Sequence, residues 1–269
     1  MKPILPPTLL FLFAASALFA APQIVAHRGA SHDAPENTVA AAKLAWAQGA
    51  DAVEIDIWLS KDGEAVVMHD ATTKRTAGKD APVVAQTLAE LRQLDAGSWK
   101  NPTFAREKVP TLDELLATLP REPGKRIFIE IKTGPEIVPA MVAAIRRARL
   151  TPAQTVIISF KYDSLVASKK ALPDYAALWL LGKPSTDPKK KSPTLDEVIR
   201  DCRAAQLDGL DLNHGWPLDS AAVKKIRDAK LQLHVWTVDD LAIARHWTAL
   251  GVDSITTNRP GWLREQLRP

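Results

Sequence analysis

The feature that most constrains the fold is a repeated alternation, in which short apolar runs rich in β-branched residues are followed by stretches with helical apolar spacing. This alternation is typical of βα units that form a parallel sheet. The predicted strands are Gln23 to His27, Asp51 to Ile57, Arg126 to Lys132, Thr155 to Phe160, Ala176 to Leu181, Gly209 to Leu212, Leu231 to Thr237 and Ser254 to Thr257. The predicted helices are Thr38 to Gln48, Thr111 to Leu119, Pro135 to Arg149, Lys161 to Ala171, Thr194 to Ala205, Leu218 to Ala229, Asp239 to Leu250 and Pro260 to Leu267. In a chain of 269 residues, 46% of them hydrophobic, this pattern predicts an α/β protein built as one (β/α)8 TIM barrel.

One apolar run, Ala65 to His69, breaks the alternation. Only the turn Ser60-Lys61-Asp62-Gly63 separates it from the second predicted strand. A parallel partner would need a crossover of about a dozen residues or more, whereas Asp-Gly between two apolar runs is typical of a hairpin. We therefore predict a hairpin over Ile57 to Met68 that projects beyond the barrel rim.

The predicted hairpin has two consequences. Antiparallel counting from Asp62-Gly63 returns His69 to the level of Ile55 or Asp56. This position lies at the carboxyl ends of the strands, where barrel enzymes carry their active sites. Residues 71–110 then form a small insertion after the second strand.

The first residues have the pattern of a secretory signal. Lys2 precedes a run from Leu9 to Ala21 that is apolar except for Ser16, and the run stops at Pro22-Gln23. A spanning helix needs about 20 apolar residues, more than this run provides. We therefore predict a signal peptide over residues 1–20 and an exported domain over residues 21–269. The mature protein is expected in the periplasm or secreted, with no stable membrane insertion after signal cleavage; the alternative is an uncleaved membrane anchor.

Charge and cysteine content exclude other classes. The 35 basic and 31 acidic residues give a formal charge of +4 and a mixed surface, so nucleic acid is not indicated as a partner. The single cysteine, Cys202, excludes an internal disulfide framework and a cysteine-rich metal site. Its helical spacing from Val198 and Ile199 predicts a buried core thiol.

Carboxylates end two of the predicted strands. Glu54 and Asp56 stand two residues apart, so they point to the same side of their strand, and Glu130 ends the next barrel strand. Three carboxylates crowded together repel one another, and such a cluster usually binds a hard cation such as Mg²⁺ or Ca²⁺. The alternative is a structural cluster neutralised by Arg28 and Lys132.

Two histidines are predicted at the same rim. His27 ends the first strand and His69 arrives through the hairpin, so together they provide the minimum for paired acid and base catalysis. Each is equally compatible with a structural role. Arg28 and Lys132 add positive charge beside the carboxylates, which suits a phosphoryl group. Their alternative role is as counterions of the acids.

An ordered set of motifs runs through nearly the whole predicted mature chain. In order, the motifs are His27-Arg28-Gly29-Ala30, Pro35-Glu36-Asn37-Thr38, Gly49-Ala50-Asp51, Glu54-x-Asp56, Lys61-Asp62-Gly63, His69-Asp70, Glu130-Ile131-Lys132, Ser159-Phe160 and Trp236-Thr237-Val238. Each motif alone is weak, but the ordered set resembles the glycerophosphodiester phosphodiesterases. The resemblance implies a (β/α)8 barrel with a small insertion after the second strand, in agreement with the hairpin argument.

The resemblance also implies roles for the residues at the rim. It implies that Glu54, Asp56 and Glu130 are the ligands of a divalent metal, Mg²⁺ or Ca²⁺. His27 and His69 resemble the acid and base pair. Arg28 and Lys132 resemble the cations that bind the phosphate.

Three further residues match the family more loosely. Glu36 and Asn37 match the motif that borders the site and are expected to contact substrate, although Asn37 also suits the N-cap of the helix that starts at Thr38. Trp236 is expected to line the pocket wall near the alcohol, and the alternative is ordinary packing at the top of the barrel.

The chain departs from the family pattern in two loops. The family often has Asn after the Trp-Thr-Val triplet, where this chain has Asp239, and often has Thr-Asp-x-Pro where this chain has Thr257-Asn258-Arg259-Pro260. Neither change falls on a predicted metal ligand or histidine. We therefore expect them to alter the fine shape of the seventh and eighth loops and, with it, the preference for the alcohol.

The resemblance implies metal-dependent hydrolysis of a small-molecule glycerophosphodiester to glycerol 3-phosphate and an alcohol. The alternative within the same chemistry is a lysophospholipase D-like hydrolysis of lysophospholipids, which needs a larger apolar groove. A third hypothesis is an exported protein that binds phosphodiesters without turnover. A binding protein has no need for both histidines.

Overall fold

The computed structural model describes residues 21–187 and 189–268, and parallel strands at its centre close into a barrel. The barrel strands are β1 (Gln23–Ala26), β2 (Ala52–Leu59), β4 (Arg126–Ile131), β5 (Thr155–Ser159), β6 (Ala176–Leu181), β7 (Gly209–Asn213), β8 (Gln232–Trp236) and β9 (Ser254–Thr257). The ring is closed because β1 pairs in parallel with both β2 and β9. This arrangement confirms the predicted (β/α)8 barrel. The predicted signal peptide, residues 1–20, lies outside the described residues.

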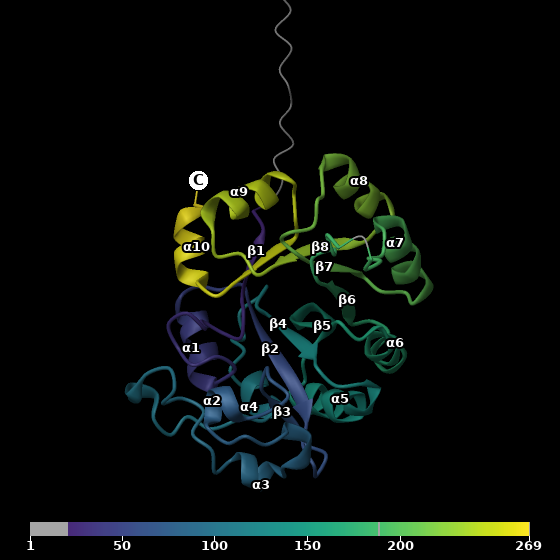
Figure 1. Cartoon of the computed structure of the whole chain (residues 1–269). Coiled ribbons are helices and arrows are strands. Elements are labelled where there is room, and N and C mark those ends of the chain that lie inside the picture. Colours follow the sequence, from purple (N-terminus) through teal and green to yellow (C-terminus); the bar gives the residue numbers. More distant parts are fainter. Residues whose placement is uncertain (1–20, 188, 269) are drawn as a thin grey trace, which may run out of the picture.

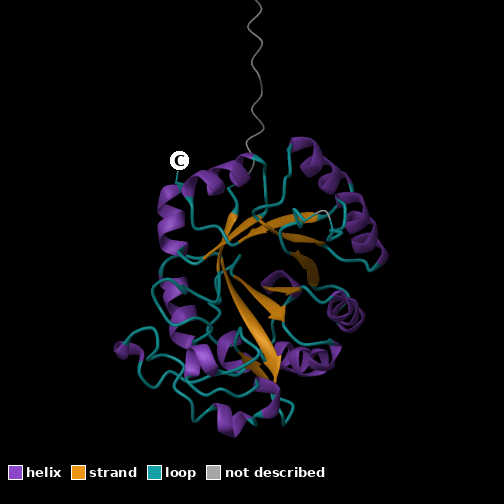
Figure 2. Cartoon of the chain, viewed as in Figure 1, coloured by secondary structure: helices purple, strands orange, loops and turns teal. Residues whose placement is uncertain are grey.

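Helices surround the strands (Figure 2). The helices outside the barrel are α1 (Val39–Ala47), α4 (Leu112–Leu116), α5 (Val138–Arg147), α6 (Tyr162–Ala171), α7 (Leu195–Ala204), α8 (Ser220–Asp228), α9 (Leu241–Ala249) and α10 (Pro260–Gln266). The helix predicted to run to Leu119 ends at Leu116, because the following amides bond three residues back (Thr118 N–H to Leu115 O, 3.0 Å) and tighten the last turn. In the part of the chain that the structure describes, no helix combines the length and apolarity needed to cross a membrane.

Alternation along the strands separates the core from the site. On β2, Val53, Ile55 and Ile57 point outward into the apolar layer beneath the helices, where burial of each side chain contributes about 1.5–3 kcal/mol. Glu54 and Asp56, which alternate with these residues along β2, point into the barrel. Cys202 is buried in the outer layer, as predicted. The carboxylates are therefore held on strands that the surrounding core fixes in place.

The predicted hairpin is present. Strand β3 (Ala65–Val67) pairs antiparallel with β2, with Ile57 opposite Val67. Gly63 adopts a φ of +85°, a conformation that favours glycine, in the turn between them. Continuing the observed register places His69 opposite Ile55. The hairpin therefore returns His69 to the carboxyl ends of β2 and β4.

Residues 71–110 pack beside this hairpin (Figure 1). They contain the short helices α2 (Lys74–Ala77) and α3 (Leu88–Leu91) and the 3₁₀ turns Val83–Ala85 and Pro102–Phe104. A small apolar cluster ties the segment to β3, and its buried members are Val66, Met68, Val83, Leu91, Ala96 and Val109. This cluster anchors the segment next to His69.

Candidate active site

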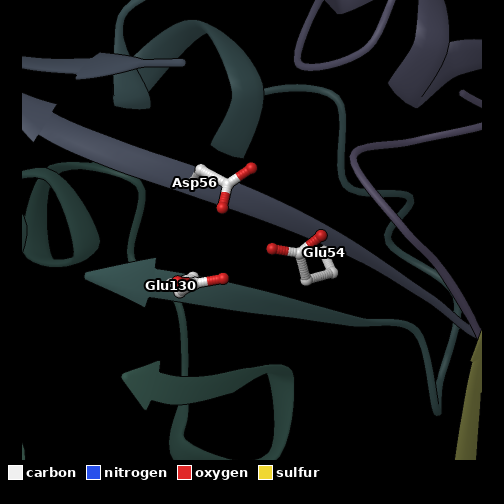
Figure 3. A group of neighbouring side chains, drawn as sticks. All are labelled: Glu54, Asp56 and Glu130. Carbon is white, nitrogen blue, oxygen red and sulfur yellow. The ribbon is translucent and has the colours of Figure 1, made fainter. Parts of the chain in front are cut away.

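Three carboxylates converge inside the barrel (Figure 3). Glu54 and Asp56 project from β2, and Glu130 projects from the neighbouring strand β4, where it pairs in register with Asp56. One oxygen from each residue lies within 4.8 Å of those of the other two. The structure therefore brings the three predicted metal ligands together.

Asp56 has the most partners of the three. Asn37 Nδ2 donates to its Oδ2 at 2.7 Å, Arg28 Nε lies 3.3 Å from the same oxygen, and Lys132 Nζ lies 3.4 Å from Oδ1. Although complete burial favours the neutral acid, Lys132 and Arg28 hold the pKa of Asp56 below its ordinary value. Asp56 is therefore the ionised member of the group.

Glu54 and Glu130 are in the opposite electrostatic position. Burial, reinforced by the charge of Asp56, raises the pKa of Glu54 well above its ordinary value and raises the pKa of Glu130 to about 8. Glu54 Oε1 is buried without a hydrogen-bond partner in the described chain, and Asp56 Oδ1 has only its ion pair with Lys132. A hard divalent cation prefers such oxygen ligands and would replace the missing partners. The residues therefore fit a divalent metal.

A strained turn brings Arg28 to the carboxylates. Arg28 and Gly29 have φ values of +56° and +80°, and a Cβ on Gly29 would lie 2.6 Å from the backbone carbon of Ala41. The turn aims the Arg28 amide at Glu54 Oε2 (2.9 Å) and its guanidinium at Glu36 Oε1 (2.9 Å). Only glycine fits this approach to α1, which explains the His-Arg-Gly sequence.

Lys132 provides the second positive charge. Its Nζ donates to Glu130 Oε1 at 2.7 Å. Burial alone would lower the pKa of Lys132, but Asp56 and Glu130 outweigh burial and raise it. Lys132 therefore remains charged at the edge of the carboxylate group.

Three predicted residues, Glu36, Asn37 and Asp56, do not line the cavity that the other seven share. Asn37 is buried and makes two hydrogen bonds to Asp56. Its Nδ2 donates to Asp56 Oδ2, and the backbone amide of Asp56 donates to Asn37 Oδ1 at 3.2 Å. The N-cap alternative for Asn37 is wrong, because Thr38 caps α1 by accepting from Ala41. Glu36 binds Arg28 and also Arg75 from α2 (2.7 Å).

His27 is held by a loop from the other end of the chain. Its Nδ1 lies 2.7 Å from Asn258 Oδ1, and Asn258 Nδ2 donates to Asp239 Oδ2 at 2.5 Å. With the amide oriented this way, Nδ1 of His27 is the donor and Nε2 carries the lone pair. Burial, together with the nearby Arg28, lowers the pKa of His27 to about 4. The Asn258 departure therefore reaches beyond loop shape, since Asn258 contacts a predicted catalytic histidine.

His69 is held by a carboxylate. Asp70 Oδ1 lies 2.7 Å from its Nδ1, and Arg75 Nε donates to Asp70 Oδ2 at 2.7 Å. Hydrogen bonds from Arg75 hold the pKa of Asp70 down at about 2, so Asp70 stays ionised beside the imidazole. Arg75 also binds Glu36, so the segment 71–110 connects the His69-Asp70 motif with the motif that contains Glu36.

Seven of the ten predicted residues line one cavity of about 170 Å³. Its polar wall consists of His27, Arg28, Glu54, His69, Glu130 and Lys132. Its apolar wall consists of Ile158, Phe160, Leu180 and Trp236. These residues lie on or directly after β5, β6 and β8. Phe160 and Trp236 pack edge to face, with ring centres 5.5 Å apart. Trp236 therefore lies at the cavity, where the resemblance implied it.

Sequence reasoning missed several residues that the structure brings to the site. Asp70 directly follows His69 and had a local signal. Asp211, which also lines the cavity, had another, because it is a lone carboxylate between Leu210 and Leu212. Arg75 had no signal, and Asn258 stood out only as a departure from the family pattern, since each reaches its partner through tertiary packing.

Fold and cavity together define a (β/α)8 barrel with acid–base groups beside a carboxylate cluster suited to a cation. Residues 27–262 match the glycerophosphoryl diester phosphodiesterase family, and the chain belongs to it. The glycerophosphodiester phosphodiesterase of Bacillus subtilis (strain 168) is 32% identical over 254 residues, covering 88% of this chain and 83% of the relative. The one from Caldanaerobacter subterraneus is 32% identical over 252 residues, covering 91% and 97%. The solved structure of an Oleispira antarctica phosphodiesterase in complex with the product sn-glycerol-3-phosphate is similar, with a TM-score of 0.81, 29% identity, and coverage of 92% of this chain and 97% of that one.

Proposed function

We propose that this chain hydrolyses glycerophosphodiesters to glycerol 3-phosphate and an alcohol such as choline, ethanolamine or glycerol, with Mg²⁺ or Ca²⁺ as cofactor. Family membership makes the chain a glycerophosphodiester phosphodiesterase. The observation that carries the proposal is the shared cavity, in which acid–base groups, cations and the carboxylate group meet along one polar wall.

Arg28 and Lys132 are proposed to bind the phosphate. Both are charged and lie on the polar wall, and both point into the carboxylate group. In a cavity with little water, fixed cations stabilise charge that develops on the non-bridging phosphate oxygens. Glu54, Asp56 and Glu130 are proposed to hold the metal, which when bound supplies Lewis-acid stabilisation of the same charge.

The two histidines are proposed to divide the proton transfers. His27 is buried and held neutral, and Asn258 accepts from Nδ1, which leaves the Nε2 lone pair to remove a proton from the nucleophile as general base. His69 Nδ1 pairs with the ionised Asp70, which orients the ring, and His69 is proposed to protonate the leaving alcohol as general acid. The nucleophile is either water or a glycerol hydroxyl.

The cavity volume favours short substrates over lysophospholipids. A space of about 170 Å³ suits a glycerophosphodiester, whereas a long acyl chain would have to lie outside it. Trp236 and Phe160 form the part of the wall that an organic arm of the diester would contact.

We also propose that residues 1–20 direct export and are removed, so that the enzyme acts in the periplasm or outside the cell. The pattern of Lys2 followed by the apolar run to Ala21 supports this proposal. Fractionation of the producing cells, with sequencing of the mature N-terminus, tests it. An uncleaved, membrane-bound chain would contradict it.

The experiment that tests the activity is release of glycerol 3-phosphate from glycerophosphocholine by the full chain and by residues 21–269. Each protein is assayed with Mg²⁺, with Ca²⁺ and with a chelator. Metal-dependent release is expected. Faster release from a long-chain lysophospholipid would favour the lysophospholipase alternative, and tight binding of substrate without release under any metal would indicate a binding protein.

A further inference from the structure

The apolar side of the cavity contains one carboxyl group that the proposed mechanism does not use. Asp211 lies in the middle of β7, in register with Leu180 of β6 and His234 of β8. Its side chain lines the cavity, yet only 1% of the residue is exposed. It therefore faces the cavity from a strand on the far side of the barrel from the carboxylate group.

The carboxyl of Asp211 lacks partners. Its Oδ1 is buried with no hydrogen bond within the described chain, and none of the ion pairs found there includes Asp211. Asp56, by contrast, is equally buried but has an amide and two cations around it. A buried polar group without a partner is destabilising, and such groups are rare unless a ligand or water completes them.

The position of Asp211 indicates which part of a substrate it meets. The groups proposed to hold the phosphate are all on the polar wall, so Asp211 faces an organic arm of the diester. Ile158 and Leu180 line the same cavity and supply apolar contacts, which suit carbon–hydrogen groups. An alcohol with hydroxyl groups on a short carbon chain matches this combination of one polar group and apolar surroundings.

The charge of Asp211 supports the same assignment. Burial raises the pKa of Asp211 to about 8, which favours the protonated acid at neutral pH. A neutral carboxyl both donates and accepts hydrogen bonds, as a hydroxyl does, and it does not repel an anionic phosphodiester. An ammonium group would instead be matched by an ionised carboxylate.

We propose that Asp211 is a specificity-determining residue that hydrogen-bonds a hydroxyl of the polyol arm of the substrate, the glycerol of a glycerophosphodiester. This inference rests on the proposed function, since it takes the polar wall as the phosphate site. It adds a recognition group on the opposite side of the cavity. The residue acts by binding and takes no part in proton transfer.

The test compares two ligands that differ only in their hydroxyls. Binding of glycerol 3-phosphate and of n-propyl phosphate to the full chain is measured by calorimetry in the presence of the activating cation. Asp211→Leu should weaken glycerol 3-phosphate binding about 10- to 100-fold and leave n-propyl phosphate within about threefold, because only the former loses a hydrogen bond. Asp211→Asn, which keeps the shape and hydrogen-bonding capacity, is the matched control and should retain most of the affinity.

Three results would overturn the inference. They are unchanged binding of glycerol 3-phosphate to Asp211→Leu, equal losses for both ligands, and a loss confined to phosphoethanolamine, which would assign the residue to an ammonium group. Thermal unfolding separates a folding defect from a binding defect, and Asp211→Leu should be no less stable than wild type. If leucine does not fit, Asp211→Ala carries the same comparison.

The inference and the proposed function can fail separately. A wild-type chain that releases no glycerol 3-phosphate from glycerophosphocholine with any cation contradicts the proposed function. A wild-type chain that turns the substrate over, while Asp211→Leu and Asp211→Ala bind both ligands as wild type does, contradicts only the role of Asp211.

Discussion

The two walls of the cavity are built in opposite ways. On the polar wall each ionisable group has at least one charged or hydrogen-bonded neighbour, as Glu130 with Lys132 and His69 with Asp70 show. The apolar wall is built mainly by packing contacts, such as the edge-to-face pair Phe160 and Trp236, and Trp236 Nε1 donates to the backbone oxygen of Asp211 at 3.1 Å. The strands that supply them are also separate, since β1, β2 and β4 carry the polar wall and β5, β6 and β8 carry the apolar one.

The difference between the walls indicates that the polar wall carries out the chemical step and that the apolar wall contributes to substrate binding. Substitutions on the polar wall leave a buried charge without its partner or remove a proton-transfer group, and both effects are large. Substitutions on the apolar wall remove contact area, and the effect on binding is modest. The following predictions test this difference.

The largest effect is expected for the two histidines. His27→Ala and His69→Ala should each lower kcat by about 10²- to 10⁴-fold, because each removes a proton-transfer group. Steady-state kinetics with glycerophosphocholine measure this loss, and His32→Ala is the control, since its side chain is 55% exposed and does not line the cavity. Activity within about tenfold of wild type in either variant would contradict the assignment of that histidine.

A smaller effect is expected for the amide behind His27. Asn258→Ala should lower kcat about 10- to 100-fold with little change in KM, because it frees the imidazole to rotate without removing it. Asn258→Asp should also lose activity, since it sets a carboxylate against Asp239.

Exchanging the two residues separates charge from position. The double variant Asp239→Asn with Asn258→Asp should recover activity, but a carboxylate on Nδ1 now favours the charged imidazole and raises the pKa of His27 above about 4. A base must be neutral to act, so the acid limb of the kcat/KM profile should move to higher pH. An unmoved limb would show that His27 is not the base.

Much of the fold was predictable because its signals are local. A buried strand reads as a short apolar run bounded by turn residues, and a tight hairpin turn reads as a pair such as Asp62-Gly63. Both patterns lie within a few residues of the chain and need no knowledge of tertiary contacts. Helix ends were less predictable, since the last turn of α4 tightens after Leu116. The polar wall was predictable because Glu54, Asp56 and Glu130 end otherwise apolar strands.

The contacts behind the polar wall were not predictable from the sequence. Asn258 reaches His27 only because β9 pairs with β1 to close the barrel, and Arg75 reaches Asp70 only because the segment 71–110 folds back. The residues next to Asn258 and Arg75 in the sequence do not indicate that these side chains contact His27 and Asp70. Asp211 is the intermediate case, since a carboxylate between two leucines is a signal of an inward polar group without revealing what it faces.

The carboxylate group should make stability depend on both pH and cation. Glu130 has a pKa of about 8 in the folded, metal-free protein and 4.5 ordinarily, so the folded state binds its proton more tightly. Stability should therefore fall as pH rises from about 4.5 to about 8 and level off above that. A divalent cation replaces the proton, so the rise in Tm on adding Mg²⁺ or Ca²⁺ should be larger at pH 8 than at pH 5, by several degrees, since 1 kcal/mol corresponds to about 2–4 °C.

The matched variant is Glu130→Gln, which keeps the shape and cannot ionise. Without cation it should be at least as stable as wild type at about pH 8, and its Tm should depend less on pH and on cation. Thermal unfolding with and without chelator measures both. A cation response as large in Glu130→Gln as in wild type would place the ion elsewhere.

The smallest effect is expected on the apolar wall. Phe160→Leu removes aromatic surface from the cavity wall and the edge-to-face contact that positions Trp236. A substrate that loses contacts of the strength of one aromatic pair, about 0.5–1.5 kcal/mol, should show a KM about 2- to 12-fold higher while kcat is retained. Kinetics with glycerophosphocholine measure both constants, and Val166→Ala, an exposed apolar residue outside the cavity, is the control. A fall in kcat comparable with that of His27→Ala would end the distinction between the walls, because the apolar side would then contribute to the chemical step as well as to binding.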